Sequence, residues 1–251
     1  MFWQFSRTTY LSSSDVKHAT LIDSSWQIEF FNIKYIINMK KYIDQHKKVW
    51  SNKQFVYSVL FAIFLILLSA IVNQFAGKYS DKMKSNNVTD AILDNIPTVN
   101  MSFVFVEGFI LLHVFMAFLA FLYPRHIPFM LKCVAMIVLT RSVFVTLTHL
   151  NVYSGHLPPE TPLILQPLYF KGDLFFSGHT AVPFILAIVF WSKRFIRYIL
   201  LGATVLLASS TLLMKLHYSI DVFAALFIAH SLFIICRKIF KKDYDFANSE
   251  G

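Results

Sequence analysis

QFVYSVLFAIFLILLSAIVNQF, the stretch from Gln54 to Phe75, has no charged side chain. An α-helix of this length rises about 33 Å, enough to cross the hydrocarbon core of a bilayer, which is about 30 Å thick. Five further apolar runs follow, one of them short, so that the candidate spans lie at 54–75, 101–123, 128–150, 180–192, 195–216 and 219–236. The sequence therefore predicts an all-α, polytopic membrane protein with a bundle of six transmembrane helices.

The composition agrees with a membrane environment. Of the 251 residues, 56% are hydrophobic and only 15% are charged, with a mean hydropathy of +0.56, whereas soluble domains have about 25% charged residues. The net charge of +9 comes from Lys and Arg beside the apolar runs, as membrane orientation requires. This pattern argues against a nucleic-acid partner and favours the membrane itself.

Three regions follow from this pattern. Residues 1–53 form an N-terminal segment in which 26–43 is either an interfacial helix or a helix packed on the bundle, because it is too short and too charged to span. Residues 54–236 form the six-helix membrane domain. Residues 237–251 read as a basic and then disordered tail.

The distribution of Lys and Arg predicts the orientation. If the N-terminus is cytoplasmic, the inner flanks of the spans contain thirteen Lys and Arg residues and the outer loops contain five. The positive-inside rule then predicts that both termini are cytoplasmic. With this topology His179, His217 and Asp221 all lie at the exoplasmic, periplasmic or lumenal side, although they are far apart in sequence.

Two short segments of this hydrophobic chain contain the candidate catalytic residues: GDLFFSGHT at 172–180 and HYSIDV at 217–222. Phosphoryl transfer needs a nucleophile, an acid for the leaving oxygen and donors for the nonbridging oxygens. His217 is the candidate nucleophile, and Asp221, four residues later, can fix its tautomer. His179 can donate the proton.

Phosphate binding is predicted for the start of the fourth span. Ser177 and Gly178 lie where the apolar helix begins, where backbone N–H groups bind phosphate and glycine permits a close approach. This constellation requires neither a metal ion nor another cofactor.

The two motifs together resemble those of the sphingomyelin synthase family, whose parent superfamily is the type 2 phosphatidic acid phosphatases. The resemblance implies a six-helix membrane fold with an outward-facing site. It also implies a phosphohistidine intermediate at His217, with Asp221 orienting the ring and His179 as acid and base.

A weaker resemblance covers residues N-terminal to these two motifs. Arg141-Ser142-x-Phe144-x-Thr146-Leu147-Thr148 is similar to the family's arginine-containing third-helix motif, and an arginine within a span is usually functional. We expect Arg141 to contact phosphate, with snorkelling or a structural ion pair as the alternative. Glu107 matches an acidic residue of the second helix and is either catalytic, substrate-binding or structural. Asp173 either assists the chemistry or caps a turn.

The chain also departs from both patterns. Lys171 replaces the synthases' cysteine, and their proline-rich first motif is reduced to Asp94-Asn95-Ile96-Pro97. Thr211 stands where the phosphatases have an arginine, and their Lys-x6-Arg-Pro motif is missing.

Three functions remain open. The first is transfer of a phospho-head group, such as phosphocholine, from a glycerophospholipid to ceramide or another lipid alcohol, releasing diacylglycerol. The second is hydrolysis at the same residues. The third is a non-enzymatic transporter or scaffold, which the complete His/His/Asp set disfavours.

Overall fold

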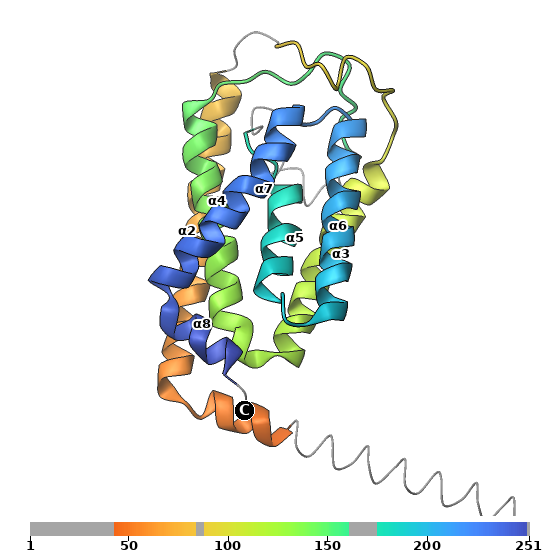
Figure 1. Ribbon diagram of the computed structural model, residues 1–251. Coiled ribbons are helices and arrows are strands. Elements are labelled where there is room, and N and C mark those ends of the chain that lie inside the picture. The colour runs from red at the N-terminus through yellow and green to blue at the C-terminus, as the bar shows by residue number, and fades with distance from the viewer. Residues whose placement is uncertain (1–42, 84–87, 161–174, 250–251) are drawn as a thin grey trace, which may run out of the picture. The chain divides into compact units, whose positions relative to one another are not determined.

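The computed structural model describes residues 43–83, 88–160 and 175–249. The chain divides into two units, Met1–Asn52 and Lys53–Gly251. In the first unit the described part is a helix over 43–50; the proposed interfacial helix at 26–43 lies almost entirely outside the described residues. The second unit consists of α2 (Lys53–Lys82), α3 (Ser102–Leu122), η1 (Pro124–His126), α4 (Ile127–Leu147), α5 (Gly178–Val189), α6 (Arg194–Leu213), α7 (Ser219–Ile239) and α8 (Lys241–Asn248) (Figure 1).

Five of these segments are long and apolar enough to cross a membrane. They are α2, α3, η1 with α4, α6 and α7. The predicted fourth span is the apolar helix α5, whose 12 residues rise only about 18 Å, less than the hydrocarbon thickness. The multi-pass architecture is therefore supported, whereas the count of six spans is not confirmed.

Helix α5 is short because protein, not lipid, surrounds it. It contacts α3, α4, α6 and α7, and most of its side chains are buried, including Ala181, Ile185, Leu186 and Ala187. A helix enclosed by others does not have to extend through the hydrocarbon, because backbone groups at its ends can be satisfied within the protein. The N-terminus of α5 therefore lies inside the bundle, below the ends of α6 and α7 (Figure 1).

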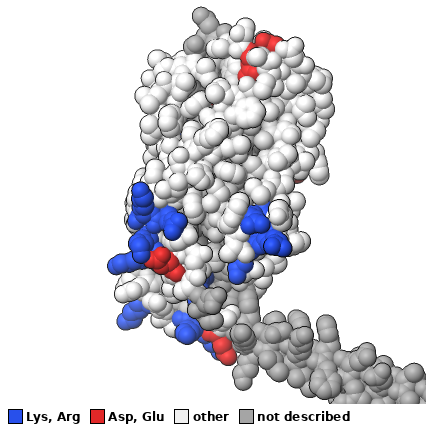
Figure 2. All heavy atoms as spheres, in the orientation of Figure 1, with Lys and Arg blue, Asp and Glu red and all other residues white. Residues whose placement is uncertain are grey.

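The outer surface of the bundle is apolar. Large hydrophobic side chains are exposed on several helices, among them Leu67, Phe75, Phe103, Leu111, Val205 and Phe227. Lys and Arg gather at the end where α8 lies, and the face in view has almost no charge between this end and the acidic side chains at the opposite end (Figure 2). An uncharged band between two polar ends is what a bilayer requires.

Helix α8 occupies part of the tail that the composition predicted to be disordered. A buried contact explains the difference: Lys132 of α4 is 4% exposed, and its ammonium lies 2.5 Å from Asp243 of α8 and 2.7 Å from the hydroxyl of Ser58 on α2. The rings of Phe61 and Phe240 flank the same ammonium. Because a buried cation requires a partner, this contact fixes α8 against α2 and α4.

Removing the carboxylate tests this explanation. Asp243→Ala leaves the Lys132 ammonium buried without its counter-ion, so we expect the free energy of unfolding to fall by about 3 kcal/mol or more. Thermal unfolding in detergent micelles measures the change. The matched control is Asp245→Ala, which breaks an exposed pair with Lys241 (side chains 55% and 75% exposed) and should cost less than about 1 kcal/mol. Equal shifts in the two variants would contradict this role.

Candidate active site

His217 and Asp221 lie where α6 turns into α7. His217 precedes α7, and Tyr218 caps the helix with an extended backbone. The Asp221 carboxylate accepts a 3.0 Å hydrogen bond from the backbone N–H of Tyr218, which fixes the carboxylate at the helix N-terminus. Its Oδ2 atom lies 3.7 Å from Nδ1 of His217. The pairing predicted from the sequence is thus present, and it leaves Nε2 as the ring nitrogen remote from the carboxylate.

Both members of this pair are buried. The side chain of Asp221 is fully buried and that of His217 is 6% exposed. The second carboxylate oxygen, Oδ1 of Asp221, is buried without a hydrogen-bond partner among the described residues. A buried carboxylate favours a positive charge beside it, so Asp221 is suited to stabilise a cationic form of His217.

The N-terminus of α5 meets that of α7. Ser177, the N-cap of α5, donates its backbone N–H to the backbone carbonyl of Asp221 at 3.2 Å. Its hydroxyl accepts a 3.2 Å hydrogen bond from Thr180. Two helix N-termini therefore converge, and each contributes partial positive charge that favours an anion.

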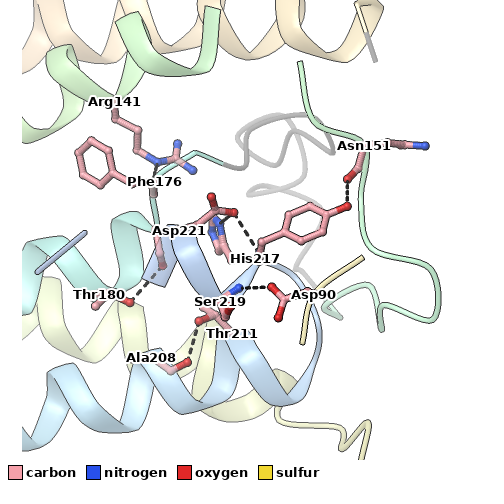
Figure 3. A network of polar contacts seen from close by, with 12 residues as sticks. Asp90, Arg141, Asn151, Phe176, Thr180, Ala208, Thr211, His217, Ser219 and Asp221 are labelled. Atoms are coloured by element: carbon pink, nitrogen blue, oxygen red, sulfur yellow. Dashed lines mark hydrogen bonds and ion pairs between the residues drawn. The ribbon is translucent and has the colours of Figure 1, made fainter. Parts of the chain in front are cut away.

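Arg141 reaches the same place from α4. Its Nε donates a 2.7 Å hydrogen bond to the backbone carbonyl of Phe176, and a Cβ on Gly178 would lie 3.6 Å from this nitrogen. Figure 3 shows Arg141 extending from α4 toward Asp221 and His217. Because Arg141 precedes the end of α4 at Leu147 by six residues, it lies about 9 Å inside the bundle. The expected proximity of Arg141 to the two motifs is present, with its hydrogen bond directed to the backbone.

His179 packs against two rings of α3. Its ring centroid lies 3.9 Å from that of Phe105, which is stacked on it, and 4.1 Å from that of Phe109, which is tilted by 34°. It is also near enough to His217 and Arg141 for electrostatic interaction with both. The two aromatic contacts hold the imidazole beside α3.

Two candidate residues are not brought into this group. Glu107 is exposed, and on α3 it lies about 160° around the helix from Phe105 and Phe109, the residues that face His179. It therefore points away from the other candidates. Asp173 lies outside the described residues.

Asp90 also belongs to this site, although the sequence did not predict it. This residue is 7% exposed. Its Oδ2 accepts a 2.7 Å hydrogen bond from the N–H of Ser219, in the first turn of α7. Its Oδ1 accepts hydrogen bonds from the N–H groups of Ile92 and Leu93 at 2.9 and 3.1 Å. Burial alone would raise the pKa of Asp90, but these backbone donors outweigh burial and lower it. An aspartate two and three residues before the N–H groups that donate to it is a turn signal, but the contact to α7 has no local signature.

Further contacts close the loops over this end of the bundle. The hydroxyl of Tyr218 donates to the carbonyl of Asn151 at 2.9 Å, and Tyr153 donates a short hydrogen bond to Asp94, which raises the pKa of Tyr153 to about 12. Tyr218 is only 3% exposed, so its role is to anchor the loop that contains Asn151. These residues, with Asp90, hold the turn that contains His217.

The arrangement suits attack on a phosphorus atom. It combines a carboxylate-oriented imidazole, a second imidazole, a guanidinium and two helix N-termini, the groups needed for nucleophilic attack, proton transfer and stabilisation of charge. In the described part of the chain, no three His, Cys, Asp or Glu side chains are grouped so as to hold a metal ion.

The role of Asp90 is testable through pH. Because the folded-state pKa lies below the ordinary value of 3.8, its contribution to stability is complete above about pH 4 and is lost as the pH falls through the lowered pKa. Asp90→Asn cannot satisfy all three N–H groups, so it should be less stable than the wild type by about 1 kcal/mol near pH 6, with a smaller difference near pH 3. Thermal unfolding at both pH values measures this, and Glu160→Gln, an exposed carboxylate, is the control. A difference that does not change with pH would refute the assignment.

Comparison with known proteins agrees with this site. No curated protein matches the chain. Residues 172–238, which are 67 of the 251, match the family model described as PAP2 superfamily C-terminal. The matched segment contains α5, α6 and α7 with His179, His217 and Asp221, and it supports a relationship of this region to the PAP2 superfamily of lipid phosphatases and phosphotransferases.

Proposed function

We propose that this protein is a membrane-embedded lipid phosphotransferase of the sphingomyelin-synthase type. The observation that carries the proposal is the convergence of His217 with Asp221, His179 and Arg141 from the ends of α7, α5 and α4. The match of residues 172–238 to the PAP2 superfamily supports the coarser class, phosphoryl transfer on lipids.

The first step forms a bond between Nε2 of His217 and the phosphorus of a glycerophospholipid head group. The Asp221 carboxylate, 3.7 Å from Nδ1, stabilises the positive charge that develops on the ring. The bond from phosphorus to the glycerol oxygen breaks, and protonated His179 donates its proton to this oxygen. Diacylglycerol leaves, and the head group stays on His217 as a phosphohistidine.

In the second step a lipid alcohol takes the head group. Neutral His179 accepts the proton of the acceptor hydroxyl, such as that of ceramide, and the oxygen attacks phosphorus. The bond from phosphorus to Nε2 breaks, which regenerates His217 and restores the proton to His179. Charge on the nonbridging oxygens is stabilised by Arg141 and by N–H groups at the start of α5, where Gly178 allows a close approach.

Hydrolysis, with water as acceptor, is the alternative. One observation favours transfer to a lipid. The position where the phosphatases have an arginine is Thr211, which is fully buried and donates to the carbonyl of Ala208 at 2.8 Å, away from the phosphate donors (Figure 3).

We also propose which side of the membrane the active site faces. The ends of the second unit lie together at the end of the bundle where Lys and Arg gather (Figures 1 and 2), and the positive-inside rule makes this end cytoplasmic. The active site then faces the exoplasmic, periplasmic or lumenal side.

Labelled ceramide and phospholipids of defined head group, supplied to membranes containing the protein, test the reaction. We expect a labelled phosphosphingolipid together with diacylglycerol. His217→Ala should reduce this product by about 10³-fold or more, because it removes the nucleophile. Release of head group or phosphate without transfer would favour the hydrolase, and substrate movement that survives His217→Ala would favour a transporter.

The matched control is Glu107→Gln. Glu107 points away from His179, so its neutralisation should leave activity within a few-fold of the wild type. Full activity of His217→Ala would refute the assignment of the nucleophile, whereas loss of activity in Glu107→Gln alone would refute the geometry of the site.

A further inference from the structure

A cavity lies away from the candidate catalytic residues His179 and His217, neither of which lines it. This cavity, of about 540 Å³, opens between α5, α6, α7 and α8, at the end of the bundle where Lys and Arg gather (Figures 1 and 2). Its size is within the range of ligand pockets, about 300–1,000 Å³. The active-site residues lie at the N-termini of α5 and α7, whereas the cavity is lined by Ile188 and Val189 at the C-terminal end of α5.

Most of the cavity wall is apolar or aromatic. Phe184, Leu201 and Phe233 line it together with His230, and Trp191, Tyr244 and Asn248 line it on the side of α8 and the α5–α6 turn. Tryptophan and tyrosine concentrate at the level of lipid head groups. The amphipathic residues of the lining therefore lie toward the basic end. A lipid bound with its head group at that end would meet them there.

Two cations flank this amphipathic side. The guanidinium of Arg237 lies 4.9 Å from the ring centroid of Tyr244. That of Arg197 lies 4.6 Å from the ring centroid of Trp191 and donates to the Trp191 carbonyl at 3.1 Å. Neither guanidinium is paired with a carboxylate among the described residues, so their charge is available to an anion.

From this combination we infer that the cavity binds one acyl chain of an anionic glycerophospholipid from the leaflet at the basic end, with the lipid phosphate held by Arg237. The apolar interior takes the chain, and the unpaired cations distinguish an anionic head group from a zwitterionic one. The site is separate from the active site, and a lipid there would bridge α5, α7 and α8.

Photocrosslinking in nanodiscs tests the inference. The probe is phosphatidylglycerol with a diazirine on one acyl chain, compared with the matching phosphatidylcholine, and peptide mapping by mass spectrometry locates the label. We expect labelling of residues 184–189 and 230–233 by phosphatidylglycerol in preference to phosphatidylcholine. Arg237→Gln should reduce this labelling on the order of tenfold, as expected for loss of a charge-assisted contact.

Two further variants make the outcome decisive. Ile188→Trp fills the cavity and should abolish labelling there even if all cations are intact. Lys241→Gln is the matched control, since it removes a cation at the same end that is already paired with Asp245 at 2.8 Å; it should leave labelling unchanged.

The labelling of the cavity tests lipid binding independently of the proposed function. His217→Ala should leave the cavity labelling intact, because the site does not depend on catalysis. Equal labelling by phosphatidylcholine and phosphatidylglycerol, or labelling that persists in Ile188→Trp, would show only annular lipid and overturn the inference.

Discussion

A fully buried carboxylate, that of Asp221, joins the elements on which the site depends. Its side chain caps α7 through the Tyr218 N–H and lies beside His217, while its backbone carbonyl accepts the N–H of Ser177 at the start of α5. One residue therefore sets the start of two helices and the position of the imidazole. A buried carboxylate needs polar partners to offset its desolvation, and here the Tyr218 N–H donates to it and the His217 ring lies beside it.

The bilayer explains where this chemistry lies. Polar groups are costly in hydrocarbon, so the spanning helices expose apolar side chains and place His217, Asp90 and Tyr153 near one end. The short helix α5 is the exception that makes a recessed site possible. Because α3, α4, α6 and α7 surround it, its N-terminus with Ser177 can lie within the bundle, next to Arg141.

Local sequence signals predicted five helices that are long and apolar enough to span a membrane, and the pairing of His217 with Asp221; the sixth predicted span is the short helix α5. The apolar run 101–123 corresponds to α3 within one residue at each end, and the four-residue spacing of His217 and Asp221 placed them together. Contacts between distant segments were not predictable in this way. Helix α2 continues seven residues beyond the expected end because the small residues Ala76, Gly77 and Ser80 are buried, and α8 forms because Asp243 meets Lys132. Asp90 escaped notice because its partner, Ser219, is 129 residues away.

The central claim is that His217 becomes covalently attached to the head group. The direct measurement is a rapid quench into alkali of the protein reacting with a phospholipid labelled in its head-group phosphate, followed by peptide mapping, since the bond from phosphorus to a histidine nitrogen survives alkali. We expect label on His217 that appears before the product and disappears when a lipid alcohol is added. Label on any other residue, or full-rate product formation with no label on the protein, would contradict it.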